Sequence, residues 1–345
     1  MLVQDVRRIA RIWVQDHFAD RPEFMGAHLM GALNEMAPEA EFPSFSDVDM
    51  NIVVEGEGQR WPDESFHQGL MLEYGIHSVD KYRDPETVIA NPGLGPNLLT
   101  NSILLDPHHI LADAHRFIAS EFGQRRWVRA RCENEKRDRI EPYFVPIGSS
   151  EAGPLERLDA LWFATLHLAG YVALAHLRRP THRRALEIAQ NILKEQQALT
   201  LYPTLLDMFG CTNWDRTQVE AFLSNAAASF DLAVTIHKTP HLGDFKLKPH
   251  LRPYLVDAAQ DMIVRGFHRE AVPWIMLFYA ISALTIGLDG TDEDRARFIT
   301  NGIMPALGDL GLVTAKDGKA RAEQSRQTAE SIYEFCEAAL ATYPD

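Results

Sequence analysis

Residues 46–54, Ser-Asp-Val-Asp-Met-Asn-Ile-Val-Val, constrain the fold more than any other stretch of this chain. Successive side chains of a strand point to opposite faces, so Asp47 and Asp49 are expected on one face and the apolar residues of the alternation on the other. Two carboxylates on one face can bind Mg²⁺, which prefers oxygen ligands and is commonly shared with substrate phosphates. The pattern therefore predicts a metal site at the start of a strand, with a third acid nearby.

Two neighbouring stretches fit such a site. Gly31 follows a helix predicted at 4–19 and a short turn, and a glycine that opens a loop lets backbone N–H groups approach a phosphate closely. Downstream, the apolar composition and period of residues 69–77 predict another strand, in which Glu73 is the lone acid. Glu73 is therefore the candidate third carboxylate.

Together, the glycine before a turn, the Asp-x-Asp strand and the acid on a neighbouring strand resemble the nucleotidyltransferase superfamily. The resemblance is strongest over about residues 24–110 and includes the antibiotic nucleotidyltransferases, such as the kanamycin nucleotidyltransferase and the streptomycin and spectinomycin adenylyltransferases. It implies that Asp47, Asp49 and Glu73 bind metal and serve catalysis, with Glu73 as a metal ligand or as the general base.

The resemblance also implies that Gly31, Ala32 and Ser46 bind the nucleotide. Ala32 departs from the family pattern, which usually has Ser beside the glycine to hydrogen-bond a triphosphate oxygen. The missing hydroxyl is expected to weaken nucleotide binding more than metal binding, and it leaves open a reduced or lost activity. Taken alone, an Asp-x-Asp at a strand edge is more often a solvated turn than a metal site, so the prediction depends on the whole constellation.

The predicted fold class is α+β. The resemblance implies an N-terminal nucleotidyltransferase (polymerase-beta-like) domain with a mixed sheet and helices at residues 1–145, and an all-α helical bundle is predicted at 146–345. With 345 residues, of which 46% are hydrophobic, the chain is long enough for two domains. The turn-rich run 146–154 marks the boundary. The helices predicted beyond it span 155–178, 182–199, 217–237, 252–265, 273–287, 292–307 and 320–342.

In the first half, strands are predicted at 48–54, 69–77 and 102–105, and apolar spacing predicts one long helix at 113–141. A basic run at 125–131 precedes several acids on that helix, which indicates a solvated helical face rather than a phosphate-binding patch.

Composition and charge narrow the kinds of substrate expected for this protein and the cell compartment in which it is expected. A formal charge of −14 argues against a nucleic-acid substrate and favours a small, cationic acceptor. Three distant cysteines, Cys132, Cys211 and Cys336, and an N-terminus without a signal-peptide core predict a cytoplasmic protein. Residues 271–288 are uncharged but contain Ser282 and lack flanking basic clusters, so we interpret them as the central helix of a bundle and expect no membrane contact.

The resemblance implies a Mg²⁺-dependent transfer of AMP from ATP to a hydroxyl of a small, aminoglycoside-like acceptor. The alternatives are a nucleotide sensor without catalysis and a nucleotidyltransferase that modifies a protein. In the bundle, His268, Arg269 and Glu270 are candidate substrate residues, because they bring three ionisable groups to the start of an apolar helix. The structural alternative is a helix start in which Glu270 favours the positive end of the helix dipole.

Overall fold

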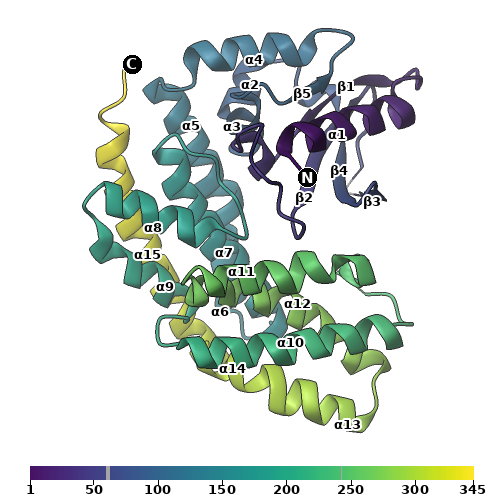
Figure 1. Ribbon diagram of the computed structural model, residues 1–345. Coiled ribbons are helices and arrows are strands. Elements are labelled where there is room, and N and C mark those ends of the chain that lie inside the picture. Colours follow the sequence, from purple (N-terminus) through teal and green to yellow (C-terminus); the bar gives the residue numbers. More distant parts are fainter. Residues whose placement is uncertain (60–62, 242) are drawn as a thin grey trace. The chain divides into compact units, whose positions relative to one another are not determined.

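The computed structural model describes residues 1–59, 63–241 and 243–345. The chain divides into two compact units. Unit 1 contains Met1–Glu135, Ala173–Thr181 and Glu337–Asp345, and unit 2 contains Lys136–Val172 and His182–Cys336. A mixed β-sheet with helices in the N-terminal part is followed by a largely helical region (Figure 1), which confirms the predicted α+β class.

The sheet of unit 1 has the strand order β3-β4-β2-β1-β5. β2 and β4 run parallel, whereas the other neighbouring strands are antiparallel. The predicted strands at 48–54, 69–77 and 102–105 are confirmed as β2, β4 and β5. The five strands are β1 (Phe24–Leu29), β2 (Asp47–Val54), β3 (Asp63–His67), β4 (Leu70–Ser78) and β5 (Ile103–Leu105).

Two of these strands, β1 and β3, have no sequence pattern that predicts them. β1 lies inside the sheet and is buried on both faces, so its side chains do not alternate between polar and apolar. β3 is a polar edge strand, Asp-Glu-Ser-Phe-His. It joins β4 through Gln68 and Gly69, which both have positive φ, as tight hairpin turns require.

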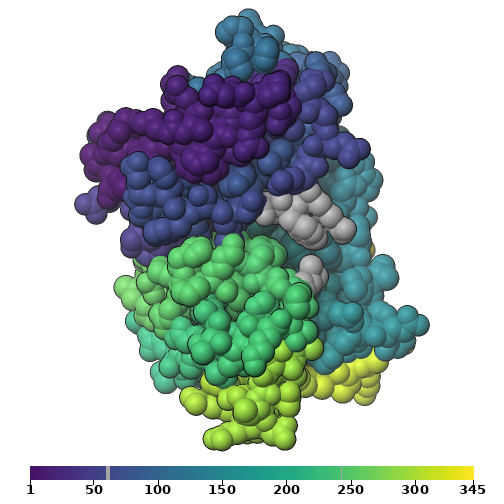
Figure 2. All heavy atoms as spheres, turned by 90° about the vertical axis from the view of Figure 1, so that its right-hand side faces the viewer, coloured from purple at the N-terminus to yellow at the C-terminus, as the bar shows by residue number. Residues whose placement is uncertain are grey.

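Apolar clusters cover the two faces of the sheet. On one face, Val6, Ala10 and Val14 of α1 (Val3–Phe18) belong to a buried cluster that also contains apolar side chains of β2 and β4. The opposite side of α1 is exposed, in the purple region of the surface in Figure 2. The cluster on the other face is built from α2 (Pro85–Ala90), α3 (Leu94–Leu98) and α4 (Ile110–Glu121).

The single helix predicted at 113–141 is wrong. α4 ends at Glu121, α5 (Arg125–Glu135) begins after a turn, and residues 136–140 form a π-helical turn. Arg131 explains the break, because its guanidinium donates to the Phe122 carbonyl at 2.8 Å and to the Ile89 carbonyl at 3.2 Å. Arg131 is fully buried, and burial lowers its pKa to about 10, so the prediction of a solvated basic face is also wrong at this residue.

Unit 2 is built mainly from helices, most of which were expected from the apolar spacing. α12 begins at His268 rather than at 273, because Pro273 is accommodated inside the helix and the Ala271 N–H already bonds to the Phe267 carbonyl at 3.1 Å. The α-helices from residue 144 onward are α6 (Phe144–Gly148), α7 (Pro154–Ala175), α8 (Ala185–Glu195), α9 (Tyr202–Phe209), α10 (Arg216–Ile236), α11 (Ala258–Val264), α12 (His268–Asp289), α13 (Asp292–Asp294), α14 (Met304–Asp309) and α15 (Ala315–Leu340).

Among the residues that the structure describes, three helices, α7, α10 and α12, are long and apolar enough to cross a membrane by length and composition. Their most apolar windows are 89%, 44% and 67% buried inside the protein, respectively. In α12, Trp274, Phe278 and Tyr279 are among the buried residues. Burial within the protein therefore accounts for most of the apolar composition of α7 and α12.

Candidate metal centre

The register of β2 and β4 brings the predicted acids together. Parallel pairing sets Asp49 opposite Glu73, and Asp47 lies two residues earlier on the same face of β2. Val48 and Met50 point to the other face and are 0% and 2% exposed. A slip of one residue would turn the carboxylates into this apolar core, so burial of the valine and methionine side chains determines which face carries the acids.

The three carboxylates have the spacing of a metal site. One oxygen from each of Asp47, Asp49 and Glu73 lies within 4.8 Å of the other two, and all three residues are partly exposed. An octahedral Mg²⁺ with ligands at about 2.0–2.1 Å holds adjacent oxygens about 2.9 Å apart and opposite ones about 4.2 Å apart. The 4.8 Å limit includes both of these separations. An all-oxygen donor set is the one that hard cations prefer, so these residues fit the predicted metal.

Gly31 lies directly against this centre. It follows β1 with φ 66° and ψ −160°, a conformation essentially restricted to glycine. A Cβ atom at this position would lie 2.3 Å from Oδ2 of Asp49. The preceding residue, Met30, donates its N–H to the Asp49 carbonyl at 2.7 Å. The structure therefore brings Gly31 together with the acids, and the close approach explains why no side chain fits there.

The other two predicted nucleotide-binding residues lie at the ends of the neighbouring elements. Ala32 is exposed and begins a short 3-10 helix, Ala32–Asn34. Ser46 directly precedes β2, is half-buried, and donates its N–H to the Pro43 carbonyl at 3.0 Å. Their contact with a nucleotide stays a prediction.

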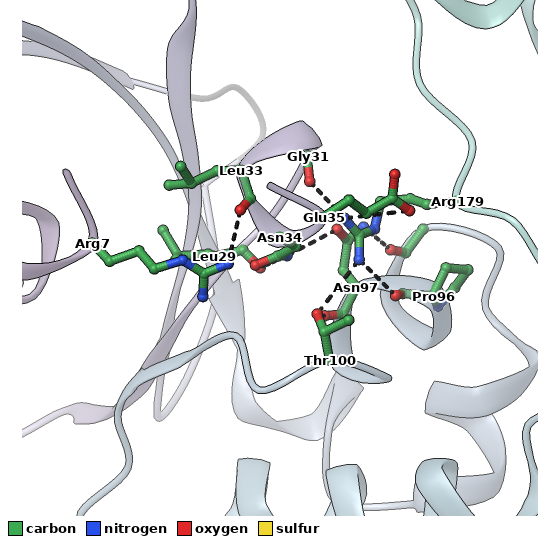
Figure 3. Close-up of polar contacts among 11 residues, drawn as sticks. Arg7, Leu29, Gly31, Leu33, Asn34, Glu35, Pro96, Asn97, Thr100 and Arg179 are labelled. Carbon is green, nitrogen blue, oxygen red and sulfur yellow. Dashed lines mark hydrogen bonds and ion pairs between the residues drawn. The ribbon is translucent and has the colours of Figure 1, made fainter. Parts of the chain in front are cut away.

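The turn at residues 31–34 is held by side chains that no local sequence pattern marks (Figure 3). Asn34 Nδ2 donates to the Leu29 carbonyl at 3.0 Å and to Oδ1 of Asn97 at 3.3 Å. Arg7, from α1, donates from Nη2 to the Leu33 carbonyl at 2.8 Å. Elements far apart in the sequence therefore hold the loop beside the carboxylates.

Arg179 makes a further contact with this turn (Figure 3). Its Nη1 donates to the Gly31 carbonyl at 2.8 Å, and its Nη2 lies 3.3 Å from the Pro96 carbonyl and 3.5 Å from the Thr100 hydroxyl. The side chain is only 3% exposed, whereas that of Glu35, whose Oε1 lies 3.9 Å from Nη1, is 53% exposed. Burial lowers the pKa of Arg179, and Glu35 opposes this effect. No local pattern marks Arg179, because its contact with Gly31 spans 148 residues.

Polar groups continue along the same face of the sheet. His28 pairs with Asn51 in the register of β1 and β2, and the Tyr82 hydroxyl lies 3.0 Å from His28 Nε2 and 3.1 Å from Asn51 Nδ2. Burial lowers the pKa of His28 to about 4, and burial together with Lys81 lowers the pKa of His77 to about 4. Both imidazoles are therefore neutral at pH 7 and add no positive charge to the face that carries the three carboxylates.

Glu64 is a further acid on this face. The antiparallel register sets it directly opposite Glu73, so the two side chains share one face of the sheet. It lies on β3, whose polar composition gives no strand signal. Glu64 is outside the group of three whose oxygens converge.

The candidate substrate residues His268, Arg269 and Glu270 form the first turn of α12 in unit 2. Glu270 is buried and accepts a hydrogen bond from the Tyr202 hydroxyl. Burial, and then the neighbouring Glu270, raises the pKa of Tyr202. Glu270 is the acid in the first turn of α12, and the structural alternative for it also stays a prediction. A role of the three residues in substrate binding stays a prediction.

Comparison with protein-family models and with curated proteins finds no match to this chain. The structure itself shows an N-terminal mixed five-stranded sheet with an acidic triad that could bind a metal ion, followed by a helical region.

Proposed function

We propose that the protein is a metal-dependent nucleotidyltransferase. It would transfer a nucleoside monophosphate, AMP from ATP in the simplest case, to a hydroxyl group of a small acceptor and release pyrophosphate. The observation that carries the proposal is the convergence of Asp47, Asp49 and Glu73 directly beside Gly31. The three carboxylates can serve as metal ligands, and the glycine beside them has no side chain that would keep a phosphate away from the backbone N–H groups.

Each residue of the centre has a role in this reaction. Asp47 and Asp49 would hold Mg²⁺, which, when bound, stabilises negative charge on the attacking and leaving oxygens. Gly31 would let the loop backbone approach the phosphates. Glu73 would either complete the metal ligands or accept the proton of the acceptor hydroxyl. In the second case, the acceptor oxygen forms a bond to the α-phosphorus as the bond to pyrophosphate breaks.

The net charge of −14 supports a cationic, aminoglycoside-like acceptor, because an acidic surface raises the local concentration of positive ligands. The same charge disfavours a nucleic-acid substrate.

One observation favours a second candidate function, a protein that binds nucleotide without catalysis. Ala32 offers no hydroxyl to a triphosphate at the position beside Gly31. Such a protein would bind Mg²⁺ and ATP but would release no pyrophosphate with any acceptor.

The metal requirement is tested by calorimetry of ATP binding with Mg²⁺ or with a chelator. Wild-type protein should bind only with Mg²⁺, and Asp49→Asn should weaken binding by about tenfold or more because a ligand charge is lost. Without metal, Asp49→Asn should leave the melting temperature unchanged or slightly raised, since three crowded acids repel one another. Asp80→Asn is the matched control, because Asp80 is exposed and pairs with Arg83. Equal binding with Mg²⁺ and with chelator would remove the metal from the proposal.

Pyrophosphate release with a panel of aminoglycosides and polyols then tests the chemistry. Glu73→Gln should abolish release because it removes the proton acceptor or a metal ligand. Retained binding of Mg²⁺ and ATP would identify Glu73 as the base, and loss of both would identify it as a ligand. If wild-type protein shows transfer and neither Asp49→Asn nor Glu73→Gln changes it, the active site lies elsewhere.

A further inference from the structure

We propose that Arg179 is a positioning residue for the Gly31 turn and that it increases the affinity for the triphosphate more than the affinity for the metal. The inference rests on the proposed function, which assigns the nucleotide phosphates to this turn. Arg179 lies in Ala173–Thr181, a segment of unit 1 that the chain enters and leaves from unit 2. Its Nη1 lies 2.8 Å from the Gly31 oxygen across 148 residues of sequence.

The hydrogen bond from Arg179 fixes more than one carbonyl group. A peptide unit is planar and trans, so its C=O and N–H point in opposite directions. By holding the Gly31 oxygen, Arg179 therefore also sets the direction of the Ala32 N–H. The same oxygen accepts the Asn34 N–H at 3.3 Å, which closes the turn. A loop already ordered in this way loses less conformational freedom when it binds a phosphate, and this raises affinity.

The guanidinium also connects this turn to a second one. Its second terminal nitrogen, Nη2, faces the Pro96 carbonyl within α3 and the Thr100 hydroxyl just after α3. The Glu35 carboxylate is more distant, 3.9 Å from Nη1, and it is half-exposed, so neutral oxygens of the Gly31 turn and of the α3 region are the main partners. A planar guanidinium can bridge two such acceptors at a fixed separation. The single ammonium group of lysine cannot, so Arg179→Lys separates this geometry from positive charge.

Arg131 provides a matched control within the same unit. Like Arg179, it is buried and donates from its two terminal nitrogens to backbone carbonyls, those of Ile89 and Phe122. Within the part of the chain that the structure describes, its hydrogen bonds go to these two carbonyls and not to the turn at residues 31–34. Arg179→Lys and Arg131→Lys should therefore both lower the melting temperature, and a purely structural role would make their other effects alike.

The test compares the two variants with wild-type protein in three measurements. These are calorimetry with Mg²⁺ and α,β-methylene-ATP, titration with Mn²⁺ alone, and hydrogen exchange of the backbone N–H of Asn34, which is the Asn34 amide meant below. Arg179→Lys should weaken binding of the ATP analogue by about tenfold and speed Asn34 exchange by about tenfold, because one charged hydrogen bond is lost. Its Mn²⁺ affinity should stay within about twofold, and Arg131→Lys should leave all three quantities within about twofold.

Several outcomes would overturn the proposal. Analogue affinity of Arg179→Lys within twofold of wild type would do so, and so would an equal loss in Arg131→Lys. If wild-type protein binds neither Mn²⁺ nor the analogue, the proposed function fails, and unchanged Asn34 exchange in Arg179→Lys would then refute the positioning role separately. If Arg179→Lys does not fold, hydrogen exchange of the wild-type protein tests the positioning role instead. The Asn34 amide should be equally protected with and without the analogue, and protection gained only on binding would contradict an ordered turn.

Discussion

Gly31 is the most constrained residue of the candidate centre. Its φ of 66° and ψ of −160° are open essentially to glycine alone, and its Cα lies against the Asp49 carboxylate. Two independent costs, backbone strain and a collision with a candidate metal ligand, therefore oppose any substitution.

Gly31→Ala is expected to lower the free energy of unfolding by about 2–4 kcal/mol and to weaken Mn²⁺ binding by more than about tenfold, because Asp49 must move. Urea denaturation and Mn²⁺ titration measure the two effects. Gly69→Ala is the control, since Gly69 also has positive φ, 81°, but a Cβ there would meet no atom of the described residues within 4 Å. It should cost about 1–2 kcal/mol of strain and leave Mn²⁺ affinity unchanged. Equal losses of Mn²⁺ affinity in both variants would show that the contact with Asp49 is not the cause.

The sequence predicts the acids of this centre better than it predicts the other residues around it, such as those that hold the neighbouring turn in place. Asp47 and Asp49 reveal their shared face because the strand period of two is visible within a few residues. Glu73 is recognisable as the lone acid of an apolar strand. Arg179 is not recognisable, because a contact across 148 residues leaves no local pattern. Glu64 is also missed, since its polar edge strand has no apolar alternation.

At the scale of elements, the periodicity of apolar residues locates most helices and strands. It fails where tertiary contacts determine whether an element forms or where it ends. Apolar residues of α4 and α5, including Ile118 and Trp127, face one core, so the pattern continues across the break between the two helices. The buried strand β1 is missed for a related reason, because burial on both faces removes alternation. The break itself depends on Arg131, which takes up the Phe122 carbonyl at the end of α4.

Because Arg131 accounts for the break between α4 and α5, we predict that Gly123, which lies inside this break, is not needed to form it. The ideal Cβ of Gly123 would lie 3.8 Å from Cδ1 of Leu177, an ordinary van der Waals contact. Gly123 is not among the glycines with positive φ. Gly123→Ala should therefore raise the free energy of unfolding by about 0.4–1 kcal/mol, because alanine has less freedom in the unfolded chain. Urea denaturation is the measurement. A loss of more than about 1 kcal/mol would mean that the turn requires glycine.

At the scale of the whole molecule, opposing titrations determine how stability responds to acid. The net charge is −14, so protonation of carboxylates relieves repulsion as the pH falls. Buried His28 acts in the other direction. Its folded-state pKa of about 4 lies below the ordinary 6.5, so between these values the unfolded chain binds more protons and stability falls with falling pH.

The contribution of His28 is isolated by comparing wild-type protein with His28→Gln at pH 7 and pH 5. From the pKa difference, wild-type protein should lose about 2 kcal/mol more unfolding free energy than the variant over this interval. Urea denaturation at each pH provides the values, and the subtraction removes the carboxylate contribution that both proteins share. Parallel pH profiles would show that His28 does not titrate as its burial requires.

The interleaved course of the chain through unit 1 has a consequence for biosynthesis. A nascent chain that has passed residue 105 already contains every strand of the sheet and the three acids. It still lacks Ala173–Thr181, and with it the guanidinium that holds the Gly31 carbonyl. On the ribosome, the carboxylates can therefore come together well before the turn at residues 31–34 is fully ordered, and a fragment ending before residue 173 would contain the acids without Arg179.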